Sequence, residues 1–132
     1  MTYNGWTRQC FEHPDCAGEA LGPGWFRGSA GSRALGAWVQ FDIGVGPAEP
    51  ARVRTIREVR FRAFGCPHVI AVAQYLSQVA PGREAEPGLP ESVESLRERF
   101  AVPVEKLGRL LTIEDAWTAA VRALSCEPPN PI

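Results

Sequence analysis

Residues 57–71 constrain the fold more than any other segment, because their pattern changes from strand to helix at a single cysteine. Apolar and polar side chains alternate over residues 59–63, which is typical of a half-buried strand. Gly65 permits a sharp turn, and Pro67 suits the first position of a helix. A strand is therefore expected to pass directly into a helix at Cys66. The positive end of that helix would favour the thiolate, the form of cysteine that binds metals and attacks electrophiles.

The segments before this junction predict the rest of a small sheet. Residues 35–45 alternate well, which predicts a second half-buried strand. One of its faces would carry Trp38, Gln40 and Asp42, and the other Val39, Phe41, Ile43 and Val45. A short strand is expected around Trp25, within the glycine-rich residues 17–34. A turn at residues 46–50 leads to a strand over residues 53–64, which indicates an antiparallel hairpin.

Helices are predicted before and after these strands in the sequence. A short helix over residues 3–13 would end at Pro14. A buried helix would begin at Pro67 and carry a broad apolar face, and residues 90–100 have the pattern of a charged amphipathic helix. Strands followed mainly by helices indicate an α+β fold, with a small, mostly antiparallel three-stranded sheet packed against several helices.

The last helix and the domain limits follow from the C-terminal part of the chain. Thr112 is expected to be the N-cap of this helix, with Glu114 and Asp115 in its first turn. A chain of 132 residues, 45% of them apolar, can bury one core, so residues 1–125 are predicted to form one domain. The proline-rich residues 126–132 are predicted to be a disordered tail.

Charge and hydropathy exclude several classes of partner. The formal net charge is −1, which indicates neither nucleic acid nor a membrane surface as a partner. The N-terminus has no signal-peptide pattern and no run is long enough to span a membrane, so a cytoplasmic location is expected. Arginines are concentrated locally, either as a solvated strand face or as a docking surface for an acidic partner. They are Arg52, Arg54, Arg57, Arg60 and Arg62.

Three of the four cysteines fall near histidines. In a reducing compartment, cysteines are thiols or metal ligands more often than disulfides. Cys10, His13 and Cys16 form a local C-x2-H-x2-C group, and together with Cys66 they would make a three-cysteine, one-histidine metal site. His68 is a further candidate ligand. The alternative is that Cys10 is a small core residue and His13 a surface residue at a helix end.

Several short segments also stand in the order found in a known family. They are Tyr3-Asn4, Phe11-Glu12-His13-Pro14, Ala34-Leu35-Gly36-Ala37, Ile56 to Cys66, Val102-Pro103-Val104-Glu105-Lys106 and Leu110 to Ala116. In these segments the chain resembles the NifU/IscU-type scaffolds of iron–sulfur cluster assembly, over nearly its whole length. The resemblance implies that family's α+β fold and a site for an iron–sulfur cluster, iron or zinc.

The resemblance also assigns the family's metal-ligand positions. The family presents three cysteines and an aspartate that closely follows the first of them. In this chain the first cysteine position is Leu35, the aspartate position is Ala37, the second cysteine is Cys66 and the third is Arg109. Arg109 brings a permanent cation to the site, which disfavours a metal and could instead pair with the Cys66 thiolate.

Three functions remain open from the sequence. The first, implied by the resemblance, is a non-enzymatic scaffold-like protein that accepts sulfur, and with it iron, at Cys66. Its expected partners are a cysteine desulfurase, a chaperone that reads residues 102–106 and an apo iron–sulfur protein, and the chain would be a monomer or a weak dimer. The second is a degenerate docking or regulatory module without a cluster. The third is a thiol enzyme with Cys66 as nucleophile and His68 or Arg109 as its activator.

Overall fold

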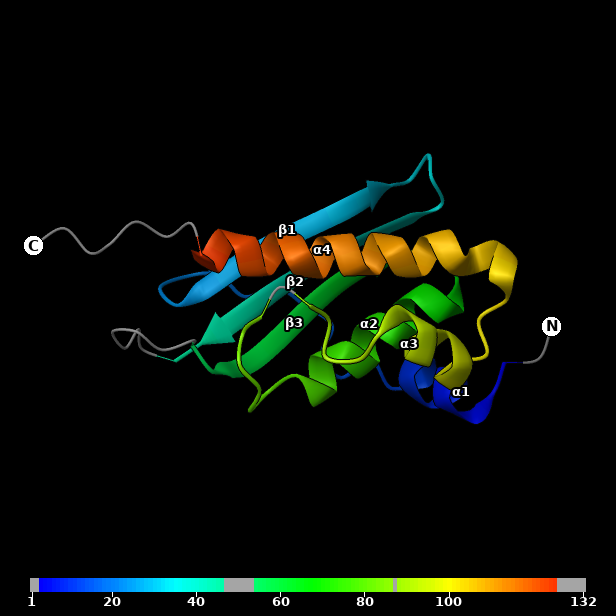
Figure 1. Ribbon diagram of the computed structural model, residues 1–132, viewed down its shortest axis with the longest axis horizontal. Coiled ribbons are helices and arrows are strands. Elements are labelled where there is room, and N and C mark those ends of the chain that lie inside the picture. Colours follow the sequence, from blue (N-terminus) through cyan, green and yellow to red (C-terminus); the bar gives the residue numbers. More distant parts are fainter. Residues whose placement is uncertain (1–2, 47–53, 87, 126–132) are drawn as a thin grey trace, which may run out of the picture.

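The computed structural model describes residues 3–46, 54–86 and 88–125, and it contains an antiparallel sheet with helices packed on one face (Figure 1). The three strands are β1 (Trp25–Ser32), β2 (Ala37–Val45) and β3 (Ile56–Phe64), with β2 in the centre. The helices are α1 (Gly5–Glu12), α2 (Pro67–Val79), α3 (Val93–Arg99) and α4 (Leu107–Ser125), and a 3-10 turn, η1 (Val104–Lys106), precedes α4. The predicted α+β fold is confirmed.

Some predicted segments differ in extent from the observed elements. β1 is longer than the short strand expected around Trp25. Most of the predicted turn at residues 46–50, the first residue of the predicted strand 53–64 and the tail at residues 126–132 lie outside the described residues. Among the residues that are described, no helix is both long and apolar enough to cross a membrane.

β2 is buried on both faces, so the prediction of a half-buried strand was wrong. On the face toward the helices, Phe41 lies edge-on to Trp117 of α4, with 5.1 Å between ring centroids. On the opposite face, Asp42 is only 1% exposed. Residues 16–18 pair with the edge of β3, and the chain then reaches over this face, where the backbone N–H of Ala20 donates to Asp42 Oδ2 at 2.9 Å. Alternation reports which side chains are polar, and it does not show that another segment passes over them.

The buried carboxylate of Asp42 is neutralised by an arginine on the neighbouring strand. The register places Arg27 of β1 opposite Asp42, and its Nε and Nη2 donate to the two carboxylate oxygens at 2.7 and 3.0 Å. These bonds raise the pKa of Arg27 above its already high value. Burying a carboxylate is tolerated here because a charge-assisted, two-bond pair replaces its water.

α4 approaches β1 so closely that only glycine fits at residue 28. A Cβ atom on Gly28 would lie 2.0 Å from the backbone nitrogen of Ala120 and 2.6 Å from the carbonyl oxygen of Ala116. Gly28 is paired with Phe41 in the sheet. The missing side chain therefore lets α4 lie along the sheet and brings Trp117 against Phe41.

α4 begins at Leu107, so the predicted N-cap at Thr112 was wrong. The turn η1 leads directly into the helix, and the chain offers no proline between them that would delay its start. Inside α4, the hydroxyl of Thr112 donates to the carbonyl of Gly108 at 3.1 Å. Glu114 and Asp115 consequently lie beyond the first turn and do not interact with the helix N-terminus as expected.

The two short helices begin at side-chain caps. The Asn4 side chain accepts a hydrogen bond from the N–H of Thr7 at 2.9 Å, and Ser92 accepts one from Ser95 at 3.1 Å. These caps shift the helix starts to Gly5 and Val93 from the predicted residues 3 and 90.

Glu91 joins α2 to α3 through a hydrogen-bonded network. Its carboxylate accepts from the Tyr75 hydroxyl at 2.7 Å, from Ser95 Oγ at 3.0 Å and from Arg99 Nε at 2.8 Å. The guanidinium of Arg99 also stacks over the rings of Trp6 and Tyr75. Burial alone would raise the pKa of Glu91, but the three hydrogen-bond donors outweigh it and hold the pKa below the ordinary value of 4.5.

We expect the substitution Glu91→Gln to destabilise the protein by about 2 kcal/mol at pH 7, because a charge-assisted network loses its anion. Because the pKa of Glu91 is lower in the folded protein, its ionised carboxylate contributes fully to stability above pH 4.5. This contribution is lost as the pH falls through the lowered pKa of the folded state. The deficit of the variant should therefore shrink in acid. Urea unfolding between pH 7 and pH 3 would measure it, with Glu94→Gln, an exposed residue, as the control. A deficit that is the same at both ends of the range would contradict this explanation.

Candidate functional site

Cys66 is the N-cap residue of α2, at the point where β3 ends and the helix begins. Its carbonyl accepts from the N–H of Val69 at 3.0 Å, while its side chain makes no capping hydrogen bond. Gly65 has a φ of +153°, which other residues rarely adopt, so it allows the sharp change of direction before Cys66. The predicted junction of strand, glycine turn and helix is confirmed, and it leaves the half-buried thiol of Cys66 without a hydrogen bond to the helix end.

Segments far apart in the sequence meet at this junction. A Cβ atom on Gly65 would lie 3.3 Å from the carbonyl oxygen of Gly36, in the β1–β2 turn. A Cβ atom on Gly36 would lie 3.9 Å from Nη2 of Arg109, in the first turn of α4. Figure 1 shows the same end of the sheet, where the β1–β2 turn and the starts of α2 and α4 gather. We call this region, formed by residues 33–37, 65–68 and 106–109, the Cys66 corner.

The positions assigned by the resemblance thus converge, but they carry no further metal ligand. Leu35 is 74% exposed and Ala37 is buried, and neither has an electron pair to donate. Arg109 is a permanent cation. An iron–sulfur cluster or a zinc ion needs four ligands, usually thiolates or imidazoles. The residues present at the Cys66 corner do not fit such a group.

His68 lies at the start of α2 and is 4% exposed. Burial lowers the pKa of His68, and the nearby charges of Lys106 and Arg109 lower it further. His68 is therefore neutral at pH 7. Its Nδ1 and the Nε of Arg109 are buried with no hydrogen-bond partner within the described residues. Lys106 was not predicted as a site residue, because only the packing of η1 and α4 beside α2 brings it near His68.

The remaining predicted ligands do not complete a metal site. Cys10 is buried in the core, and burial raises the pKa of its thiol, so it stays protonated. His13 is exposed at the end of α1. Cys16 lies where the chain has turned toward the edge of β3, and its sulfur accepts from Gln74 Nε2 at 3.6 Å. Over residues 3–46, 54–86 and 88–125, no three His, Cys, Asp or Glu side chains form a group that could hold a metal ion.

The expected gathering of Cys10, His13, Cys16 and His68 around Cys66 is therefore not found in the described residues. The physical reason is local. The face of α1 that holds Cys10 packs into the core, and the chain bends after His13 at Pro14.

A cavity of about 450 Å³ lies on the outer face of the sheet, beside the end of β3. It is lined by Arg33, Trp38, Arg62, Ala63 and Phe64. The guanidinium carbons of Arg33 and Arg62 lie 5.3 and 5.8 Å from the ring centroids of Phe64 and Trp38. Trp38 and Phe64 can be recognised in the sequence as aromatic residues. That they lie opposite each other follows only from the register of β2 against β3.

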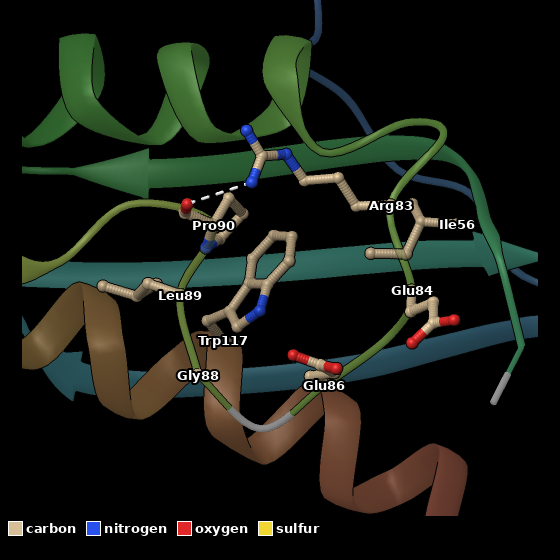
Figure 2. A pocket seen from close by; sticks show the side chains of 8 residues that line it. All are labelled: Ile56, Arg83, Glu84, Glu86, Gly88, Leu89, Pro90 and Trp117. Atoms are coloured by element: carbon tan, nitrogen blue, oxygen red, sulfur yellow. Dashed lines mark hydrogen bonds between the residues drawn. The ribbon is translucent and has the colours of Figure 1, made fainter.

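A second cavity, of about 380 Å³, lies near the start of β3 and is therefore separate from the Cys66 corner (Figure 2). Its lining residues are Ile56, Arg83, Glu84, Glu86, Gly88, Leu89, Pro90 and Trp117. Figure 2 shows the ring of Trp117 between the two arms of the loop that joins α2 to α3. One arm carries Arg83, Glu84 and Glu86, and the other carries Gly88, Leu89 and Pro90. Arg83 Nη1 donates to the carbonyl of Pro90 at 3.2 Å, which ties the two arms together.

Comparison with known proteins gives a consistent result. The sequence profile of the NifU-like N terminal domain family matches residues 2–126. Among solved structures, the fold is similar to that of a nitrogen-fixing NifU-like protein (N-terminal) from Brucella abortus. The TM-score is 0.68 at 13% sequence identity, and the match covers 95% of both chains. At that identity the structural likeness shows the fold alone.

Two curated proteins are similar over about half of this chain. The iron sulfur cluster assembly protein 1, mitochondrial, from Debaryomyces hansenii is 30% identical over 67 residues, which is 51% of this chain and 37% of that protein. The bifunctional protein NifU/MnmA from Rubrobacter xylanophilus is 41% identical over 71 residues, which is 54% of this chain and 13% of that protein. The match therefore spans well under half of each relative. The family profile extends along nearly the whole chain and agrees with the observed fold, so the chain belongs to the NifU-like N-terminal domain family.

Proposed function

We propose that this chain serves iron–sulfur cluster assembly as a scaffold-like protein that accepts sulfur at Cys66. The observation that carries the proposal is the placement of Cys66. Its thiol stands at the positive end of α2, without a capping hydrogen bond, at the corner where the family's ligand positions meet. Membership of the NifU-like family and the similarity to an iron sulfur cluster assembly protein support this role. In it the chain is a carrier and not an enzyme.

Sulfur would reach Cys66 by transfer from a persulfide on a cysteine desulfurase. The Cys66 thiolate attacks the outer sulfur of the donor persulfide, and a new S–S bond forms on Cys66. The donor S–S bond breaks, and its electron pair leaves on the donor cysteine as a thiolate. The exchange needs one accessible thiolate and no added oxidant.

Further partners follow from the same role. A chaperone would read residues 102–106, where Val104 is 71% exposed, and an apo iron–sulfur protein would receive the product. Because the Cys66 corner does not fit a complete cluster, cluster cargo would require ligands from outside one chain, such as Cys66 of a second copy in a weak dimer.

Mass spectrometry after incubation with a cysteine desulfurase and free cysteine tests the proposal. We expect the wild-type protein to gain the mass of one sulfur atom on the peptide that contains Cys66, and the Cys66→Ser variant to gain none. Cys16→Ser is the matched control, because Cys16 is also a half-buried thiol, and it should behave like the wild type. Equal sulfur uptake by Cys66→Ser would overturn the proposal.

The second candidate function is a docking or regulatory module that has kept the fold and lost the cluster. Leu35 and Arg109, which occupy two ligand positions, favour it. The same experiment separates the two functions, because a docking module would bind the desulfurase tightly and gain no sulfur. A thiol enzyme would instead turn over a substrate with repeated cycles at Cys66.

A further inference from the structure

The Cys66 corner carries an excess of positive charge. Lys106 ends the turn η1, and Arg109 lies in the first turn of α4, where its Nη2 is 3.9 Å from the position of a Cβ atom on Gly36. The N-terminus of α2 adds the positive end of its macrodipole. No acidic residue of the described chain is ion-paired with Lys106 or Arg109. The corner therefore favours an anion and disfavours a metal cation.

The polar groups at the corner also lack partners. Nε of Arg109 and Nδ1 of His68 are both buried with no hydrogen-bond partner among the described residues. A buried polar atom without a partner is destabilising unless a ligand satisfies it. The fork of guanidinium N–H donors on Arg109 suits an anion that arrives beside Gly36.

We infer that Arg109 is the counter-ion of a persulfide on Cys66, so that this corner retains sulfur as an anion in place of a metal. The inference deepens the proposed function and rests on it for the source of the sulfur. A persulfide places its charged outer sulfur about 2 Å beyond the thiol sulfur, so the anion reaches further from the N-cap of α2 than the thiolate does. A guanidinium that hydrogen-bonds this sulfur stabilises the persulfide over the free thiolate. Arg109 acts here as a binding residue, because its guanidinium contacts the charged sulfur directly.

Equilibration with glutathione persulfide tests the inference without a desulfurase. In this exchange the Cys66 thiolate attacks the outer sulfur of glutathione persulfide, the donor S–S bond breaks and glutathione leaves as its thiolate. The equilibrium constant is obtained from the fraction of Cys66 that carries sulfur, at fixed concentrations of glutathione and its persulfide. We expect Arg109→Gln to lower this constant about tenfold relative to wild type, and Arg109→Lys to retain most of it.

Arg122→Gln is the matched control, because Arg122 is an exposed arginine in the last turn of the same helix. It should leave the constant unchanged. Circular dichroism of each variant checks that it has folded, and Arg109→Lys preserves a test if Arg109→Gln does not fold. An unchanged constant in folded Arg109→Gln would overturn the inference. Wild-type protein that binds stoichiometric iron or zinc at Cys66 would also overturn it.

The experiment separates this inference from the proposed function. If sulfur uptake from glutathione persulfide depends on Arg109 but no sulfur is taken up from a desulfurase, the desulfurase is not the sulfur donor. The role of Arg109 in binding the persulfide anion would still be supported. Uptake from a desulfurase that is equal in wild type and Arg109→Gln, with equal equilibrium constants, would support the proposed function and remove the role of Arg109.

Discussion

Gly28→Ala is expected to destabilise the protein by about 3 kcal/mol or more, because a methyl group has no space between β1 and α4. The new Cβ would lie 2.0 Å from the backbone nitrogen of Ala120, and backbone atoms cannot move aside as a flexible side chain can. α4 would have to lift from the sheet, which would also separate Trp117 from Phe41. Thermal unfolding should show a decrease in Tm of roughly 10 °C or more for a chain of this size.

Gly108→Ala is the matched control for this prediction. Gly108 lies in the first turn of α4, and a Cβ atom there would meet nothing within 4 Å. Alanine forms helix better than glycine, so this variant should be stabilised by up to about 1 kcal/mol. The same chemical change should thus have opposite effects at the two positions. A Gly28→Ala protein as stable as wild type would show that α4 does not lie on β1 as described.

Arg27→Met is expected to have the second large effect, a loss of about 3 kcal/mol. The substitution leaves the Asp42 carboxylate buried, and among the described residues only the N–H of Ala20 still donates to it. Removing one partner of a buried ion pair is strongly destabilising, because the other charge stays away from water unpaired. The side chain of Arg27 is itself 32% exposed, so the larger part of the effect comes from Asp42.

A double-mutant cycle measures this coupling. In Arg27→Met/Asp42→Asn the buried charge is gone while the amide oxygen can still accept from Ala20, so the double variant should recover about half of the loss or more. Arg60→Met removes an exposed pair with Glu58 on the same sheet and should change stability by less than about 1 kcal/mol. A double variant that is less stable than Arg27→Met would contradict the assigned cause.

The parts of the fold that the sequence predicts are those set by short-range chemistry. The strand, Gly65, Cys66 and Pro67 follow one another without interruption, so the junction needs no distant contact to define it. The alternation of β2 and the apolar stripe of α4 likewise report local periodicity. The start of α4 was misplaced because Thr112 resembles a cap in sequence but bonds to Gly108 inside the helix.

The parts that it does not predict depend on which segments meet. Nothing near Asp42 in the sequence indicates that Ala20 lies against it, and nothing near Gly28 indicates that α4 does. The candidate site divides in the same way. Cys66 could be identified locally, whereas the proximity of Lys106 and Arg109 to His68 depends on the packing of α4 beside α2.

At the Cys66 corner, side chains that determine the chemistry can change with little effect on the fold. Two of its ligand positions, Leu35 in a turn and Arg109 at a helix start, lie outside the buried core, so exchanging side chains there changes reactivity at little expense in stability. Ala37 differs, because it is buried, so a larger side chain there would require the surrounding core to repack. A lineage that alters this corner can therefore gain or lose ligands one at a time at positions 35 and 109, while position 37 restricts which ligand sets can be assembled.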